Sequence, residues 1–197
     1  MSTTPNLDFV TAQIATGGDL PYSDHRDLPI LAQWHRLGIT HVIDNRVEWD
    51  DEAHVRRYAP HITYLHNGVD DAGGRQPDRW YEHGVAFARA ALTDPGAKVL
   101  IHCHMGINRG PSLTYAVLLD LGWDPVGAIA AIRAARPIAA VLYAEDALDW
   151  FHRSRGIHAA QRLDDHRRLA AWREANWIDV VRIIRQHRMA EARRSVA

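Results

Sequence analysis

The sequence predicts an α/β fold, in which a central, mostly parallel twisted sheet has helices on both faces and C-terminal helices follow. Short runs of β-branched and apolar residues alternate with longer segments of helical periodicity, and this alternation is typical of βαβ units. In addition, an apolar run at residues 98–102 leads straight into a short loop and then into a helix start near Gly110 and Pro111. A loop between a central strand and a helix is therefore expected.

The first half of the chain contains the expected strands. Helical periodicity predicts intervening helices at residues 27–37 and near residues 51–58. Composition predicts four strands, at residues 9–16, 40–44, 62–66 and 98–102.

The second half is expected to be mostly helical. A helix opens at Pro77 and runs to about residue 92, and another runs from about residue 110 to Gly122. Asp124 has the character of an N-cap and Pro125 that of a first helical residue, which predicts a third helix ending at residues 136–137. From about residue 158 onward, apolar residues are spaced for one or two amphipathic helices.

Length and composition predict one folded domain with an appendage. The chain has 197 residues, of which 47% are hydrophobic and 24% charged, the balance of a globular protein. Residues 157–197 hold nine Arg and five Asp or Glu, a net of +4, which leaves −5 for residues 1–156. We therefore expect a main domain over 1–156 and a basic, helical extension over 157–197 that packs on it.

The same composition bears on where the protein is located and on whether it needs a cofactor. No run of about 18 apolar residues is present and the first residues lack a secretory pattern, so no membrane partner and a cytoplasmic location are expected. The single cysteine cannot form an internal disulfide or a four-cysteine zinc site. His102 and His104 are not followed by a second cluster of ligands, so no metal or other cofactor is expected.

The loop after the 98–102 strand carries the chemistry. Its backbone N–H groups and the start of the next helix would converge on one point and attract an anion such as phosphate. Gly106 allows the tight curl that such a loop needs. Cys103 would share this positive field, which favours its nucleophilic thiolate. Arg109 offers a planar fork of donors that can hold two phosphoryl oxygens.

Cys103 and Arg109 form a Cys-x5-Arg signature, and His102 and Gly106 fit its longer form. Residues 9–151 resemble the protein tyrosine phosphatases, most closely the small dual-specificity phosphatases. The resemblance implies that the cysteine attacks phosphorus, that water later releases phosphate from a cysteinyl-phosphate, and that no metal takes part. It also implies that His102 orients the loop and that the phosphate is bound by His104, Met105, Gly106, Ile107 and Asn108.

The resemblance further implies a general acid on a loop upstream of the cysteine. Asp71 matches the family spacing best and Asp70 is one residue off, although both also suit a solvated turn. The sequence departs from the family at Gly110, where a Ser or Thr usually helps the sulfur leave. Ser112, two residues on, is a candidate substitute. Arg46 follows an expected strand and is either a site residue or an exposed arginine.

Three functions are compatible with this segment. The leading one is hydrolysis of phosphotyrosine, and of phosphoserine or phosphothreonine, in a phosphoprotein substrate. Asn108 and the sequence Ala-Arg-Pro at 135–137 also look like the RNA 5′-triphosphatase part of capping enzymes, although the overall charge makes nucleic acid an unfavoured partner. The third is a phosphopeptide-binding module with weak turnover, which Gly110 would explain.

Overall fold

The computed structural model describes residues 6–20 and 27–196 and contains a five-stranded sheet. The strand order is β1-β2-β5-β3-β4, and all neighbouring strands are parallel except β1 and β2. The strands are β1 (Leu7–Phe9), β2 (Ile14–Gly17), β3 (His41–Asp44), β4 (Thr63–His66) and β5 (Val99–His102). The expected strands at 40–44, 62–66 and 98–102 are thus confirmed to within one residue, and β5 lies at the centre.

The single strand expected at 9–16 is wrong, because this segment is most of a hairpin. Leu7 pairs with Gly17 and Phe9 with Ala15 in antiparallel register. Thr11 makes the turn, since its Oγ1 accepts hydrogen bonds from the backbone N–H groups of residues 13 and 14 at 3.2 and 3.0 Å. Apolar residues on both arms hide a turn that contains no glycine or proline, so the pattern reads as one strand.

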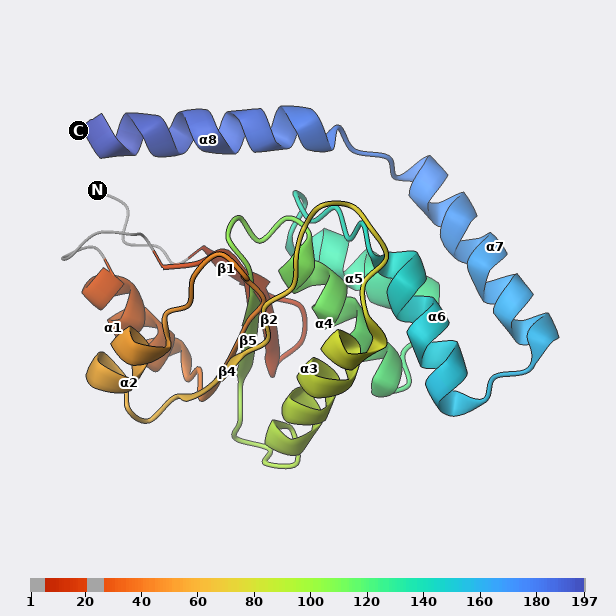
Figure 1. Cartoon of the computed structure of the whole chain (residues 1–197), viewed down its shortest axis with the longest axis horizontal. Helices are drawn as coiled ribbons and strands as arrows, with labels where there is room; N and C mark the ends of the chain where they lie inside the picture. Colours follow the sequence, from red (N-terminus) through yellow and green to blue (C-terminus); the bar gives the residue numbers. More distant parts are fainter. Residues whose placement is uncertain (1–5, 21–26, 197) are drawn as a thin grey trace.

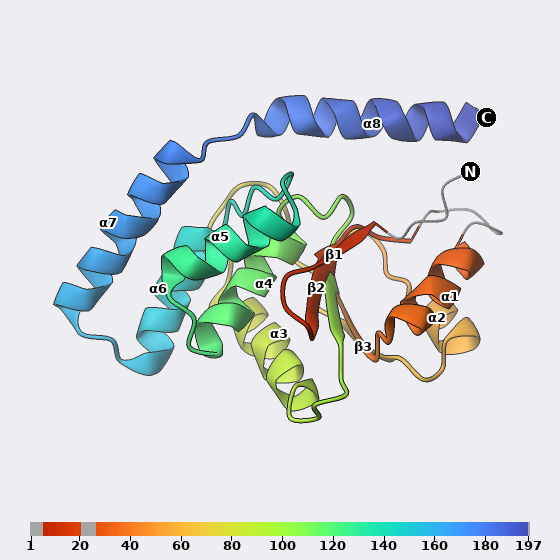
Figure 2. The same cartoon turned by 180° about the vertical axis from the view of Figure 1, so that it is seen from behind.

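Helices cover both faces of the sheet (Figures 1 and 2). On one face lie α1 (Asp27–Leu37) and α2 (Glu52–Tyr58). On the other lie α3 (Asp78–Ala91), α4 (Arg109–Asp120), α5 (Pro125–Ala135) and α6 (Ala144–Arg155). Successive β5 residues alternate between the two cores, with Val99 and Ile101 in the larger one and Leu100 in the smaller. The predicted α/β fold is therefore confirmed.

Helices α1 to α5 lie where they were expected, and Asp124 caps α5 by accepting from the N–H groups of Val126 and Gly127 at 3.0 and 2.9 Å. Helix α6 was not expected. Its N-cap is Tyr143, whose side chain makes no cap hydrogen bond, so the usual polar start signal is missing. It forms because Ala144, Ala147 and Leu148 are fully buried in the core.

Two helices follow, α7 (Ala159–Ala175) and α8 (Val180–Val196). Helix α7 packs against the domain through Leu169, which is fully buried, and through Trp172, which lies beneath the Arg133 guanidinium at 5.7 Å. Helix α8 runs back along the molecule in both views (Figures 1 and 2), and its Val181 and Met189 are more than half exposed. No helix in the described ranges is long and apolar enough to cross a membrane.

Candidate active site

The loop between β5 and α4 is anchored to strand β2. The N–H of Cys103 donates to the carbonyl of Gly17 at 3.3 Å, which ties the loop to β2. Gly106 has φ +66°, and a Cβ there would lie 2.4 Å from the Gly17 carbonyl carbon. Only glycine satisfies both constraints, so the loop depends on Gly106 and the β1–β2 hairpin. Cys103 itself is 3% exposed.

Arg136 binds the backbone of the loop and links it to the first hairpin. Its Nε donates to the carbonyl of Gly106 at 2.6 Å and its Nη2 to the carbonyl of Met105 at 3.0 Å. The same guanidinium donates to the side chains of Asn6 and Asp8 at 2.7 Å each. Because these two carbonyls point back to Arg136, the arginine fixes the loop peptides against the first hairpin. Sequence reasoning noticed this arginine only as part of a motif and missed its role.

The segment between α5 and α6 closes the other side of the loop. Ala140 donates its N–H to the carbonyl of Ile107 at 2.7 Å, and Leu142 donates its N–H to Oδ1 of Asn108 at 2.8 Å. Between them, Val141 has φ +50°, a conformation that β-branched residues rarely adopt. This strained backbone is stabilised by the contacts around it, and it presents two donors to the loop.

Arg109 sits at the first position of α4, and two neighbours fix its guanidinium. Nη1 and Nη2 donate to the two carboxylate oxygens of Glu48 at 2.8 and 2.9 Å, and Nη1 also donates to the carbonyl of Val69 at 3.1 Å. A guanidinium has five N–H donors, so three are used. Those that remain are the Nε–H, which has no hydrogen-bond partner among the described residues, and one N–H of Nη2. They lie on the same edge and form a fork for two oxygens.

Glu48 is a site residue that sequence reasoning missed. Burial alone would lower the pKa of Arg109. The hydrogen bonds to Glu48 and the charge of the nearby Cys103 thiolate together raise this pKa. The hydrogen bond to Arg109 in turn lowers the pKa of Glu48. Both groups are therefore held in their charged forms, and Arg109 is 3% exposed.

Asp71 lies over the loop, whereas Asp70 does not. The Oδ1 of Asp71 accepts from Asn108 Nδ2 at 2.6 Å and from the Tyr143 hydroxyl at 2.7 Å, and its Oδ2 is 3.5 Å from Arg109 Nε. Burial and the hydrogen bond to Asp71 raise the pKa of Tyr143 to about 12, so the phenol remains a donor. Asp70 is exposed, and its backbone carbonyl accepts a hydrogen bond from Gln76 Nε2.

Gly110 packs tightly against β5. A Cβ at this position would lie 3.0 Å from the carbonyl oxygen of Ile101 and 3.1 Å from the carbonyl carbon of His102. Ser112 is fully buried, and its hydroxyl donates to Asn108 Oδ1 at 3.3 Å and accepts from the Tyr143 N–H at 3.3 Å. Its hydroxyl is thus engaged with Asn108 and the backbone of Tyr143, and a side chain at position 110 would require a small shift of α4 from β5.

A buried ion cluster lies beside the loop. Arg46 is fully buried and pairs with Asp44, Asp51 and Asp19, at 2.6, 2.6 and 3.0 Å. Burial alone would raise the pKa of Asp44, but nearby His102 and Arg46 lower it to about 2. Arg46 is therefore not a surface residue, and the alternative of an exposed arginine was wrong. Its N–H groups bind carboxylates beside the loop, so its role as a site residue stays a prediction.

The two histidines beside Cys103 differ. His102 is fully buried, its Nε2 is 4.0 Å from Asp44 Oδ1, and neither ring nitrogen has a hydrogen-bond partner in the part of the chain that is described. His104 is partly exposed, its Nδ1 is 2.9 Å from Asp19 Oδ2, and its ring meets Trp49 edge-on at 5.4 Å. The His104 ring thus helps to form the rim of the loop.

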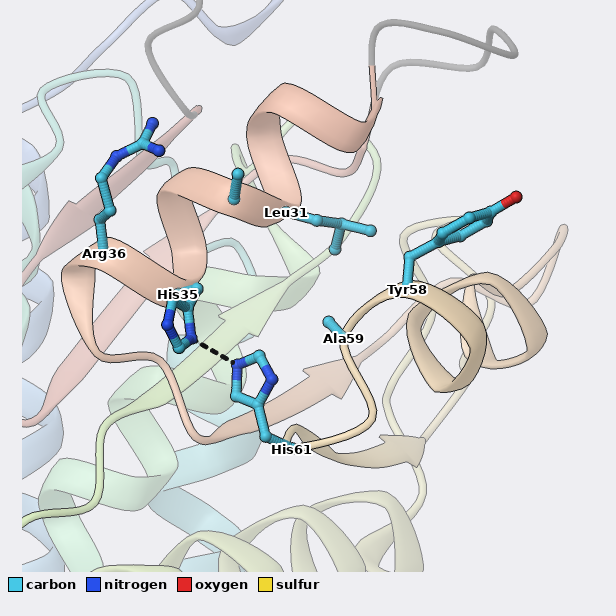
Figure 3. A pocket seen from close by; sticks show the side chains of 7 residues that line it. Leu31, His35, Arg36, Tyr58, Ala59 and His61 are labelled. Carbon is cyan, nitrogen blue, oxygen red and sulfur yellow. Dashed lines mark hydrogen bonds between the residues drawn. The ribbon is translucent and has the colours of Figure 1, made fainter.

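A hollow of about 400 Å³ lies elsewhere, between α1 and α2. Figure 3 shows His35 Nδ1 facing His61 Nε2 across it, at 3.1 Å. Its lining includes Leu31 and Tyr58 but no residue of the 103–109 loop. This hollow therefore plays no part in the chemistry of the loop.

The central strand, the tight loop after it, the buried cysteine and the arginine at the start of the next helix together define the class of cysteine-dependent phosphatases. The family model for the catalytic domain of dual specificity phosphatases matches residues 22–141. The chain belongs to this family.

Related proteins agree with this assignment. Dual specificity protein phosphatase 26 of Mus musculus is 33% identical over 87 residues, which are 43% of this chain and 40% of the relative. The Bos taurus protein of the same name is 30% identical over 100 residues, 49% of this chain and 43% of the relative. The matched region thus spans less than half the length of these relatives.

Solved structures share the fold. Human DUSP28 aligns with a TM-score of 0.62 and 20% identity over 77% of this chain and 97% of that one. PTPMT1 in complex with PI(5)P aligns with a TM-score of 0.60 and 19% identity over 76% of this chain and 99% of that one. At these identities the likeness concerns the fold.

Proposed function

We propose that this protein is a metal-independent phosphatase that hydrolyses phosphate monoesters of phosphoproteins, phosphotyrosine above all, in the cytoplasm. The observation that carries the proposal is the edge of Arg109 formed by Nε and Nη2, because Glu48 and Val69 occupy the other three N–H groups. On this edge Nε has no hydrogen-bond partner among the described residues, and the Asp71 carboxylate lies 3.5 Å away. A phosphoryl group bound there has two oxygens on the guanidinium, and its remaining oxygen faces the loop amides.

In the first step, the Cys103 thiolate forms an S–P bond as the bond from phosphorus to the leaving oxygen breaks. Arg109 and the N–H groups of residues 104–109 bind the phosphoryl oxygens throughout. Asp71 donates a proton to the leaving oxygen. In the second step, Asp71 takes a proton from a water that attacks phosphorus, the S–P bond breaks, and inorganic phosphate and the thiolate are released.

The role of Asp71 as the acid is supported by its position rather than by its spacing in the sequence. It contacts Asn108 and is 3.5 Å from Arg109 Nε, so a leaving oxygen on the bound phosphate is within its reach. Tyr143 and Asn108 fix the carboxylate from two directions. Asp70, one residue away, has no such contacts in the described structure and serves as a matched control.

Exposed apolar side chains next to the site support the preference for an aromatic phosphate. Val47 and Trp49, on either side of Glu48, are 55% and 39% exposed, and Leu142, bound to the loop through Asn108, is 44% exposed. Apolar side chains at the mouth of the site favour burial of a phenyl ring over that of a short serine side chain.

The experiment compares hydrolysis of p-nitrophenyl phosphate and of matched phosphotyrosine and phosphoserine peptides, in buffer with EDTA. We expect turnover that is lost in Cys103→Ser, reduced about 10²- to 10⁴-fold in kcat by Asp71→Asn, and unchanged by Asp70→Asn. Equal loss in the two aspartate variants would contradict the assignment of the acid. Turnover that survives Cys103→Ser would contradict the whole mechanism.

Gly110 favours a second candidate, a phosphopeptide-binding module whose phosphoenzyme hydrolyses slowly. The position has no hydroxyl, and the hydroxyl of Ser112 is engaged by Asn108 and Tyr143. Rapid-mixing kinetics distinguish the two. A burst of one p-nitrophenol per chain followed by near-arrest supports the module, whereas a steady rate without a burst supports the phosphatase.

A further inference from the structure

A cluster of potential metal ligands joins α6 to α7, away from the 103–109 loop. Asp149 and His152 lie three residues apart on α6, and His166 lies on α7. One ligand atom from each side chain lies within 4.8 Å of those of the other two. Ligand atoms about 2.1 Å from a tetrahedral zinc ion lie roughly 3.4 Å apart, so small side-chain rotations would complete the site.

His152 provides an independent indication. It is 1% exposed, its Nε2 is 3.0 Å from Asp165 Oδ2, and its Nδ1 is buried without a hydrogen-bond partner among the described residues. A buried nitrogen without a partner is costly. Because the Asp165 carboxylate accepts a hydrogen bond from Nε2–H, the neutral ring carries its free lone pair on Nδ1, as in a metal ligand.

Asp165 has the position of a supporting partner. Its Oδ1 accepts from Gln161 Nε2 at 2.8 Å, which fixes the carboxylate on the far nitrogen of His152. Histidines that bind metals commonly donate their second N–H to a carboxylate in this way. On the open side, Asp149 Oδ1 and His166 Nε2 are hydrogen-bonded at 3.0 Å, a contact that a bound ion would replace. The two side chains are 46% and 33% exposed, so an ion can enter from solvent.

A second cluster with similar spacing shows what excludes an ion. Asp44, Asp51 and His102 also bring three potential ligands together. There, however, the Arg46 guanidinium binds both carboxylates at 2.6 Å, so a positive charge already occupies the position. In the α6–α7 cluster, the neighbouring Arg153 and Arg155 pair with Asp78 and Asp120 instead.

We propose that Asp149, His152 through Nδ1, and His166 bind a divalent transition-metal ion, zinc by preference, with water completing the coordination. Two imidazoles and one carboxylate suit zinc better than magnesium or calcium, which prefer oxygen ligands. The ion links α6 of the catalytic domain to α7, and so holds the C-terminal extension in place. The proposal does not depend on the phosphatase reaction, which uses no residue of this cluster.

The test uses the full chain carrying Cys103→Ser, which keeps the ion off the only thiol. After EDTA treatment and desalting, zinc is added and followed by native mass spectrometry and isothermal titration. We expect one ion per chain, a rise of a few degrees in Tm, and slower hydrogen exchange in α7. Binding should be lost with His166→Ala, weakened about 10- to 100-fold with Asp165→Asn, and kept with His83→Ala, an exposed histidine of α3.

Two outcomes would overturn the proposal. Equal zinc affinity in His166→Ala and His83→Ala would place the ion elsewhere. A folded chain that binds no zinc, in which His166→Ala lowers Tm to the same extent with and without the metal, would show that Asp149 and His166 are only an ion pair. Because His166 is one-third exposed, its replacement should not prevent folding.

Discussion

Replacing Glu48 by glutamine tests how the arginine of the site is oriented. The change keeps the size of the side chain and one acceptor oxygen but removes the charge and one of two hydrogen bonds to Arg109, at 2.8 and 2.9 Å. A hydrogen bond to a charged group contributes about 1.5–3 kcal/mol. Since Glu48 is 42% exposed, we expect a loss of about 2 kcal/mol, which is roughly 30-fold in kcat/KM.

The assay is steady-state hydrolysis of p-nitrophenyl phosphate, together with inhibition by inorganic phosphate. In Glu48→Gln, both kcat/KM and phosphate affinity should fall, because Arg109 has to be reoriented for each bound oxyanion. Glu52→Gln is the matched control, since Glu52 pairs with Arg56 at the surface and such pairs contribute little. If Glu48→Gln instead binds phosphate more tightly, Glu48 competes for the phosphate position and the reasoning is refuted.

Three further predictions concern the loop and its support. Gly110→Ser should lower the free energy of unfolding by about 1–2 kcal/mol because its Cβ would lie 3.0 Å from the Ile101 carbonyl, and should reduce any burst by speeding the second step; an unchanged Tm would refute the close packing. Arg136→Lys should lower kcat in p-nitrophenyl phosphate assays, since lysine cannot replace four contacts; unchanged kinetics would contradict this. The pKa of Asp44 is about 2 in the folded chain, against 3.8 for a free carboxyl, so the ionised carboxylate stabilises the fold by about 2 kcal/mol above pH 4, and this stabilisation is lost as pH falls through 2. The free energy of unfolding in urea should therefore decrease between about pH 4 and pH 2, and Asp44→Asn should remove most of this dependence.

The phosphate loop could be predicted from sequence because its parts are contiguous. Cys103, Gly106 and Arg109 lie within seven residues, between an apolar strand and a helix start. Residues this close in sequence fall in one loop whatever the rest of the chain does, although the first hairpin and Arg136 fix the backbone of that loop. The parallel strands and their flanking helices were predictable for a similar reason, since each is a local periodicity in a single segment.

Tertiary structure alone decided which distant side chains meet this loop. Glu48 reaches Arg109 across 61 residues because β3 and β5 are neighbours in the sheet. The family spacing favours Asp71 over Asp70, and the tertiary structure adds the contacts of Asp71 with Asn108, Tyr143 and Arg109.

Packing also determines the elements that have no capping or turn residues in the sequence. Helix α6 lacks a polar cap and forms because its apolar face is buried against the core. The first hairpin turns at Thr11 without glycine or proline. The sequence by itself therefore determined the chemistry of one loop, whereas burial and strand order, which depend on the whole chain, decided what orients it.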